Sequence, residues 1–182
     1  PILILNVLGP EESAYYYMAM MLATFLFTIS TSATQSLFAV ASHSDARMVE
    51  MIKKVLKFLG LLLVPAIIVT VILGPHILSI FGSGYSDEGT GLLRILAISS
   101  ILVAFNSIAR TIFRVHYRTV TLTVVSFLGS ISVIVFSYIL REYNLNGVGM
   151  AWFIGEAIAL LLYGLLIARD RHRLLPAQDI KI

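Results

Sequence analysis

The sequence predicts an all-α polytopic membrane protein, a helix bundle with about five transmembrane helices. The first observation is composition: 58% of the 182 residues are hydrophobic, 13% are charged, and the mean hydropathy is +0.92. A water-soluble domain of this size could not cover itself with polar surface. The second is length, since five apolar runs reach the roughly 20 residues that a membrane-crossing helix needs. Strands of a membrane barrel would be about half as long and would alternate polar with apolar residues.

The five predicted spans follow one another with short polar breaks. Gly74 and Pro75 close the second span, and residues 144–147 break the chain before the last one. Residues 76–89 are too few and too rich in glycine to cross a bilayer, so they predict a short interfacial helix and a loop. The predicted spans are residues 14–41, 48–73, 91–115, 120–140 and 148–168.

The two ends of the sequence carry separate expectations. Residues 1–8 are apolar and precede the turn at Gly9 and Pro10, so they predict the end of a preceding helix. Because the sequence starts with Pro1, we expect the chain to be a fragment of a longer protein. No basic region followed by a short apolar core marks a signal peptide at its start. Residues 9–182 then form one transmembrane unit that ends in a tail, residues 169–182.

Orientation is predicted from the Lys and Arg residues, because positive charge near span ends is retained in the cytoplasm. Alternate span ends collect eleven of the 13 basic residues, and the other ends hold only Arg94 and Arg141. The C-terminus and the loops near residues 43 and 116 are therefore expected in the cytoplasm, in a multi-pass protein of the cell membrane. Topology accounts for the basic pI of about 9.3, so no nucleic-acid partner is expected. The eleven are Arg47, Lys53, Lys54, Lys57, Arg110, Arg114, Arg118, Arg169, Arg171, Arg173 and Lys181.

One face of the first span is polar along its length. Thr24, Thr28, Thr31 and Gln35 recur at i, i+4, i+7 and i+11, which places them on one side of a helix. Threonine hydroxyls in membranes bond to their own preceding turn or to a neighbouring helix. Both ordinary helix packing and the wall of a water-lined cavity explain such a face.

A column of polar residues recurs every four positions in and after the third span: Asn106, Arg110, Arg114 and Arg118. The last two fall at the predicted boundary, where arginines extend to the headgroups without further function. Arg110 lies about 6 Å deeper and Asn106 about 12 Å deeper. The planar guanidinium suits a pyrophosphate, because it donates two bonds to anionic oxygens. Arg110 and Arg114 are thus candidates for contact with a substrate headgroup, with membrane topology as the alternative.

Glu156 is the deepest charged residue of the sequence. It lies about 13 Å inside the fifth span, near the middle of a hydrocarbon core about 30 Å thick. A carboxylate there costs about 2.5 kcal/mol or more, so it is expected either to couple a proton or cation or to bond to a neighbouring helix. We expect it protonated at pH 7, far from any cation and shielded from lipid by Trp152 and Tyr163. The candidate hydroxyl partners are Ser126, Ser130 and Ser132.

The sequence offers no enzyme chemistry and no cofactor site. Cysteine is absent, so there is no thiolate nucleophile and no Cys-based metal site. The four histidines, His43, His76, His116 and His172, lie on different segments, and no two have metal-ligand spacing. A membrane glycosyltransferase or polymerase would need an acidic metal-binding loop of useful length, and this sequence has no such loop. We therefore expect neither an enzyme nor a bound metal.

Four stretches together resemble one transporter family. They are VLGPEESAYYYMAMMLATFLFTISTSATQSLF, then ASHSDARMVEMIKKVLKFLGLLLVP, then ILGPHILSIFGSGYSDEGTGLLRILAISSILVAFNSIARTIFRV, and finally LNGVGMAWFIGEAIALLL. The Leu-Gly-Pro-Glu turn, the Phe-Gly and Leu-Arg-Ile-Leu pattern and the Gly-rich helix start are similar to the polysaccharide transporter branch of the multidrug/oligosaccharidyl-lipid/polysaccharide exporter superfamily. That branch includes O-antigen and other lipid-linked oligosaccharide flippases.

The resemblance implies a fold, a function and partners. Members have two lobes of six helices and flip lipid-linked sugars across the membrane by alternating access. The five spans would match helices eight to twelve, in the C-terminal lobe, whose partners are the lipid bilayer, the lipid-linked sugar and the N-terminal lobe of the same protein. Two functions stay open. One is a flippase with Arg110 and Arg114 near the headgroup, and the other is a cation-coupled multidrug exporter with Glu156 as its coupling carboxylate.

Overall fold

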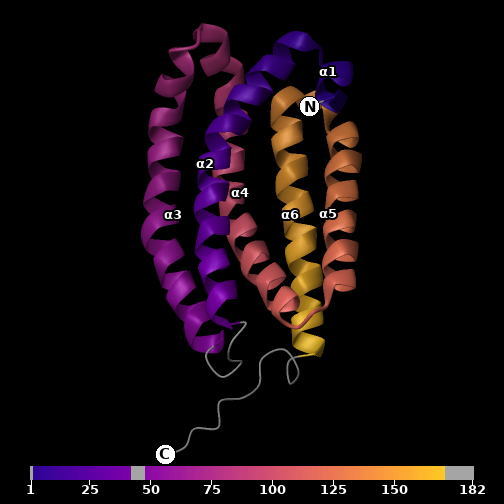
Figure 1. The fold of residues 1–182 in the computed structure, drawn as a ribbon. Helices are drawn as coiled ribbons and strands as arrows, with labels where there is room; N and C mark the ends of the chain where they lie inside the picture. The colour runs from indigo at the N-terminus through magenta and orange to yellow at the C-terminus, as the bar shows by residue number, and fades with distance from the viewer. Residues whose placement is uncertain (1, 42–47, 171–182) are drawn as a thin grey trace, which may run out of the picture.

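A computed structural model of the chain describes residues 2–41 and 48–170, with side chains for residues 4–35 and 49–170. In these ranges every regular element is a helix, which confirms the all-α prediction (Figure 1). The expected loop near residue 43 and the tail beyond residue 170 lie outside the described residues. The elements are α1 (Ile2–Val7), α2 (Pro10–Ala41), α3 (Met48–Ser79), α4 (Ser83–Val115), α5 (Thr119–Ile139), the short 3-10 helix η2 (Arg141–Tyr143) and α6 (Asn144–Arg169).

Helices α2 to α6 are each long and apolar enough to cross a membrane. They stand side by side and alternate in direction, whereas α1 is short and lies beside the beginning of α2 (Figure 1). Length and composition therefore define a multi-pass membrane protein with five candidate spans, as the sequence predicts.

Helix α4 is the central helix of the bundle. It packs against α2, α3 and α6, whereas α5 packs mainly against α6. Of the apolar window of α4, 67% is buried, compared with 11% for α5. This helix carries Asn106, Arg110 and Arg114 of the polar column, of which Asn106 is buried, Arg110 is half-buried and Arg114 is exposed.

The turn between α3 and α4 differs from the prediction. Helix α3 continues through Gly74 and Pro75 to Ser79, and α4 begins at Ser83, so the expected interfacial helix and loop over residues 76–89 are wrong. Tertiary contact outweighs the local signal here: a Cβ at Gly74 would lie 2.7 Å from a methyl group of Leu93 on α4. The chain reverses only at residues 80–82, where Gly82 has a φ of 133°.

The break before the last span is also displaced. Residues 144–147 were expected to interrupt the chain, but they form the first turn of α6, and the interruption is η2. Asn144 takes a positive φ of 50° at the start of this helix. Gly147 then packs so closely against the carbonyl of Leu140 that no Cβ fits between them.

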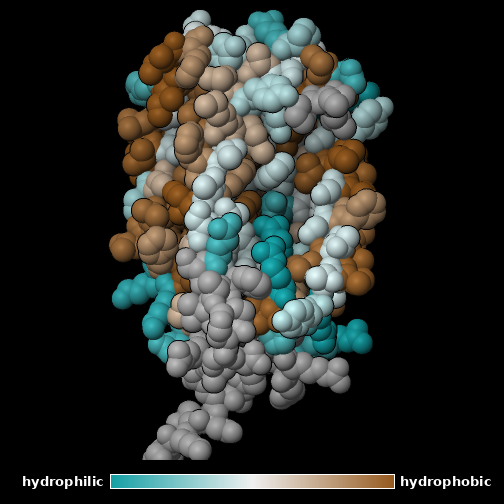
Figure 2. Space-filling model, viewed as in Figure 1, coloured by the Kyte–Doolittle hydropathy of each residue, from teal (hydrophilic) through white to brown (hydrophobic). Residues whose placement is uncertain are grey.

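Charges collect at the two ends of the bundle and apolar side chains on its sides. Figure 2 shows large brown areas on both flanks, teal patches towards the ends, and a pale to teal strip along the middle of the visible face. The end at which α3 and α5 begin is called the basic end, and the opposite end the acidic end. That the basic end faces the cytoplasm stays a prediction. The basic end holds Lys53, Lys54, Lys57, Arg114, Arg118 and Arg169, and the acidic end holds Glu11, Glu12, Asp87, Glu88 and Glu142, together with Arg94 and Arg141.

Candidate functional site

The polar face of α2 is exposed along its length: Thr24, Thr28, Thr31 and Gln35 all reach the surface of the described chain. Thr24 donates to the carbonyl of Met20 at 2.7 Å, and Thr28 donates to that of Thr24 at 2.8 Å. Thr31 likewise bonds within α2, to the carbonyls of Phe27 and Thr28. Because these hydroxyl bonds stay inside one helix, they do not fasten α2 to a neighbour. Both interpretations left open by the sequence, helix packing and a cavity wall, accommodate such bonds.

The basic end of this face borders a cavity between α2 and α4, here called the basic cavity. Its volume is about 250 Å³, which is room for several water molecules. Polar side chains line it throughout, and they include two arginines. The lining residues are Thr31, Thr34, Gln35, Ser107, Arg110, Thr111 and Arg114.

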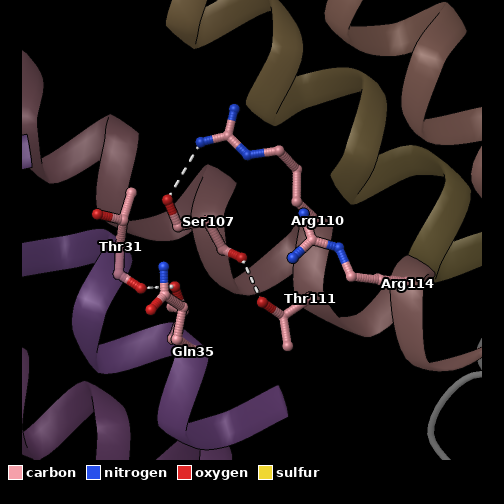
Figure 3. Close-up of a pocket in the computed structure, with 7 residues that line it drawn as sticks. Thr31, Gln35, Ser107, Arg110, Thr111 and Arg114 are labelled. Atoms are coloured by element: carbon pink, nitrogen blue, oxygen red, sulfur yellow. Dashed lines mark hydrogen bonds between the residues drawn. The ribbon is translucent and has the colours of Figure 1, made fainter. Parts of the chain in front are cut away.

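The side chain of Arg110 points along α4, away from the basic end. Its Nη2 donates to the Oγ of Ser107 at 3.1 Å, and Ser107 lies one turn towards the start of α4 (Figure 3). Side chains of a helix lean towards its N-terminus, which for α4 is at the acidic end. An arginine extending to the nearer membrane surface would have to point the other way. The direction of Arg110 therefore argues against simple extension to the headgroups.

Arg114 occupies a different part of the basic cavity. Figure 3 shows its guanidinium in the space between α2 and α4, on the side of Thr111 and Gln35, while Arg110 extends away from it. Arg114 is exposed, whereas Arg110 is half-buried. The two cations thus cover different parts of the same cavity wall.

Asn106 ties α4 to α6 at mid-span. Its side chain is fully buried, and its Nδ2 donates to the Oε2 of Glu156 at 2.6 Å and to the backbone carbonyl of Glu156 at 2.8 Å. The two hydrogens of one amide therefore serve both the carboxyl and the main chain of Glu156.

The expected serine partner of Glu156 is wrong. Ser132 donates to the carbonyl of Leu128 on its own helix at 2.8 Å, and the hydroxyl of Ser126 shares a hydrogen bond with that of Tyr163 at 3.3 Å. Ser130 lines the same cavity as Glu156, but the donor to the carboxyl is Asn106. The reason is that α4, the central helix, packs against α6 at this level and brings a better donor, an amide with two hydrogens.

Glu156 borders a second cavity of about 140 Å³, here called the carboxyl cavity. Its walls come mainly from α5 and α6 and include Ser126, Ser130 and Tyr163, with Trp152 beside Glu156. Trp152 stacks on Phe27 of α2, with ring centres 5.9 Å apart and planes 7° apart. Arg110 also lines the carboxyl cavity, so it belongs to both cavities.

Glu156 and Arg110 were expected to lie far apart, but the fold brings them to one cavity. The depth estimate placed Glu156 far from any cation, and its protonation at pH 7 was expected on that ground. That ground is wrong, because Arg110 lines the same cavity. The estimate followed Cα positions, whereas the arginine side chain reaches a further turn towards the start of α4. Ser107, Thr34 and Thr111 were also missed. In that order, they lie three residues from Arg110, Thr31 and Arg114, and this spacing was the available signal.

Two buried polar atoms near Glu156 have no hydrogen-bond partner within the described chain, Asn106 Oδ1 and Trp152 Nε1. Within residues 2–41 and 48–170, no three His, Asp or Glu side chains come together in a way that could hold a metal ion. The polar interior is therefore built from arginines, amides, hydroxyls and one carboxyl.

The fold and the site define a multi-pass membrane protein with a basic, hydroxyl-lined cavity between its helices. Comparison of the chain with protein-family models, with curated proteins and with solved structures finds no match. The functional argument therefore depends on the chemistry of the cavity.

Proposed function

We propose that the chain is part of a transporter that flips a lipid-linked oligosaccharide across the cell membrane by alternating access. The observation that carries this proposal is the basic cavity, where two arginines meet a row of hydroxyl and amide groups between membrane-crossing helices. Charged side chains at membrane depth are costly and are kept for function. Arg110, below the predicted membrane boundary, and Arg114, at that boundary, line one cavity and together suit an anionic ligand.

The three parts of such a substrate match three kinds of surface. Arg110 and Arg114 would hold the phosphate groups, since guanidinium groups donate in pairs to anionic oxygens. The exposed stripe from Thr24 to Gln35 would border the sugar, whose hydroxyls exchange hydrogen bonds with threonine and glutamine side chains. The lipid chain would stay in the bilayer against the apolar flanks of the bundle. In this proposal a second lobe covers the stripe, and the basic end faces the cytoplasm.

The charge of the basic cavity separates this function from drug export. An exporter of organic cations should present acids to its substrate, whereas the basic cavity is lined by two arginines and by neutral side chains. Glu156 lines the carboxyl cavity and shares it with Arg110. This arrangement favours an anionic substrate.

The test is complementation of a flippase-deficient strain by the full-length protein. We expect wild type to restore surface glycan and the Arg110→Ala/Arg114→Ala double variant to fail. Each lost charged hydrogen bond is worth about 1.5–3 kcal/mol, so binding should weaken at least about tenfold per arginine. Arg94→Ala is the matched control, because Arg94 is an exposed arginine of the same helix near the acidic end. Normal glycan with the double variant, at equal membrane levels, would refute the site.

A further inference from the structure

Arg110 connects the basic cavity to the carboxyl cavity. It is the one described cation that lines both, and its side chain extends from α4 towards the level of Asn106 and Glu156. Asn106, one turn before Arg110 on the same helix, holds the carboxyl group of Glu156. A charged donor and a carboxyl acceptor are thus presented to one small cavity from neighbouring helices.

Arg110 and Glu156 are not paired with each other in this state. Arg110 donates to the neutral hydroxyl of Ser107, and Glu156 accepts from the neutral amide of Asn106. Of the ion pairs formed by residues 4–35 and 49–170, none joins these two side chains. The arginine therefore has two possible anionic partners, Glu156 on one side and a ligand in the basic cavity on the other.

The surroundings of Glu156 leave this arginine as its nearby counter-charge. From α4 it faces Asn106 and Arg110, and α5 contributes the neutral hydroxyls of Ser126 and Ser130. From α6 it faces Trp152 and the phenol of Tyr163, which is bonded to Ser126. Helix α2 contributes Phe27 through its stack on Trp152. Among the described groups around Glu156, Arg110 is the cation.

We propose that Glu156 and an anionic ligand compete for Arg110, so that anion binding in the basic cavity is linked to proton uptake by Glu156. This inference rests on the proposed function, because it assumes that the basic cavity binds an anion. With the cavity empty, an ionised Glu156 attracts Arg110 and is stabilised by it. A bound anion neutralises the arginine, and Glu156 then loses its counter-charge and takes up a proton.

The direction of the linkage follows from this exchange. The liganded protein holds more protons than the empty one, so anion affinity must fall as the pH rises through the titration of Glu156. For a full proton exchanged, the limiting slope is about tenfold in affinity per pH unit. Glu156 would thereby make the affinity for the anionic headgroup depend on pH without touching the headgroup.

The experiment measures sulfate binding to the purified full-length protein by calorimetry across a pH series. Sulfate is the probe because it stays fully ionised where carboxyl groups titrate, so protons taken up belong to the protein. In wild type we expect affinity to fall with rising pH, and a dye in weak buffer to report proton uptake on sulfate addition. Glu156→Gln keeps an acceptor for Asn106 through its amide oxygen. We expect this variant to bind sulfate more tightly at high pH, with no pH slope and no proton uptake.

Controls separate this inference from the proposed function. Glu142→Gln removes an exposed carboxyl at the acidic end and should keep the wild-type slope. Binding that is lost in Arg110→Ala but independent of pH in wild type would refute the competition and leave the anion site standing. A dependence of sulfate affinity on pH that persists in Glu156→Gln would also refute the competition. Wild type that binds no sulfate at any pH would overturn both. The dye measurement needs only wild type, so misfolding of a variant does not remove the test.

Discussion

Asn106 joins two helices through one side chain. Asn106→Ala removes both donations to Glu156, and the carboxyl and carbonyl oxygens then lose a buried donor. The free energy of unfolding should fall by about 1–3 kcal/mol. Thermal denaturation of the purified protein in detergent measures this loss of stability. Ser132→Ala is the control, since that hydroxyl bonds only to Leu128 of its own helix. Equal melting temperatures for the two variants would contradict the role of Asn106.

Thr28 tests whether the exposed stripe of α2 serves transport. Its hydroxyl bonds to the carbonyl of Thr24 within the same helix, so Thr28→Val should change stability by no more than about 0.5 kcal/mol. If the stripe borders the sugar, restoration of surface glycan should decrease severalfold, because one hydrogen-bonding group is lost. Thr123→Val is matched to it: Thr123 is an exposed threonine of α5 bonded to its own preceding turn. Equal glycan levels in the two variants would remove the stripe from the site.

Part of the candidate site could be predicted as single residues, but its side-chain pairs could not. Arg110, Arg114, Thr31 and Gln35 were recognised because each is polar where the sequence is otherwise apolar, and all four line one cavity. The partner of Glu156 was missed because a hydrogen bond between residues 106 and 156 depends on how α4 and α6 pack. Helical periodicity within one span does not contain that information.

At the scale of the helix, α5 and α6 approach each other closely at small residues. A Cβ on Gly155 of α6 would collide with the side chain of Val133 and lie 3.1 Å from the carbonyl of Gly129, both on α5. Gly155→Ala should therefore lower the free energy of unfolding by about 1–3 kcal/mol, a typical cost of overpacking.

Gly164→Ala on the same helix is the matched control for this substitution. A Cβ there meets nothing within 4 Å, so the change should be neutral or stabilising by up to about 1 kcal/mol. Unfolding of both variants in a denaturing detergent series, followed by far-ultraviolet circular dichroism, makes the comparison. A Gly155→Ala variant as stable as Gly164→Ala would show that the two helices can separate at no cost.

Helix boundaries were predicted well at one end of the bundle and poorly at the other. At the acidic end, glycine and proline suggested breaks at Gly74, Pro75 and residues 144–147, yet helices run through both places. Close contacts of Gly74 with Leu93 and of Gly147 with Leu140 explain the difference. A glycine needed for close packing and a glycine needed for a turn look alike in a single sequence.

For the whole molecule, the distribution of charge predicts the sidedness of the bundle. The sequence has no cysteine, so single cysteines can be introduced without background labelling. Cysteines at Asp87 and Glu142 should react with an impermeant maleimide in intact cells. Cysteines at Thr119 and Arg169 should react only after the membrane is opened. The reverse pattern would invert the orientation and contradict the cytoplasmic placement of the basic end.

The number of spans and the separation of charge were predictable because they depend on totals over 20 or more residues. A total over a whole span changes little when a few boundary residues are assigned wrongly. All five predicted spans form helices of sufficient length. The central position of α4 was not predictable in this way. Its hydropathy resembles that of α5, and yet one is mostly buried and the other mostly exposed. Which helix becomes central depends on pairing between segments that are distant in sequence.

The bond between Asn106 and Glu156 also constrains how the protein is made. Asn106 on α4 is synthesised 50 residues before Glu156, its partner on α6. In that interval the amide of Asn106 and the guanidinium of Arg110 have no α6 to contact, and lipid chains offer them no hydrogen-bond partner. We therefore expect the polar contact between α4 and α6 to delay the full release of α4 into lipid until α6 has been synthesised.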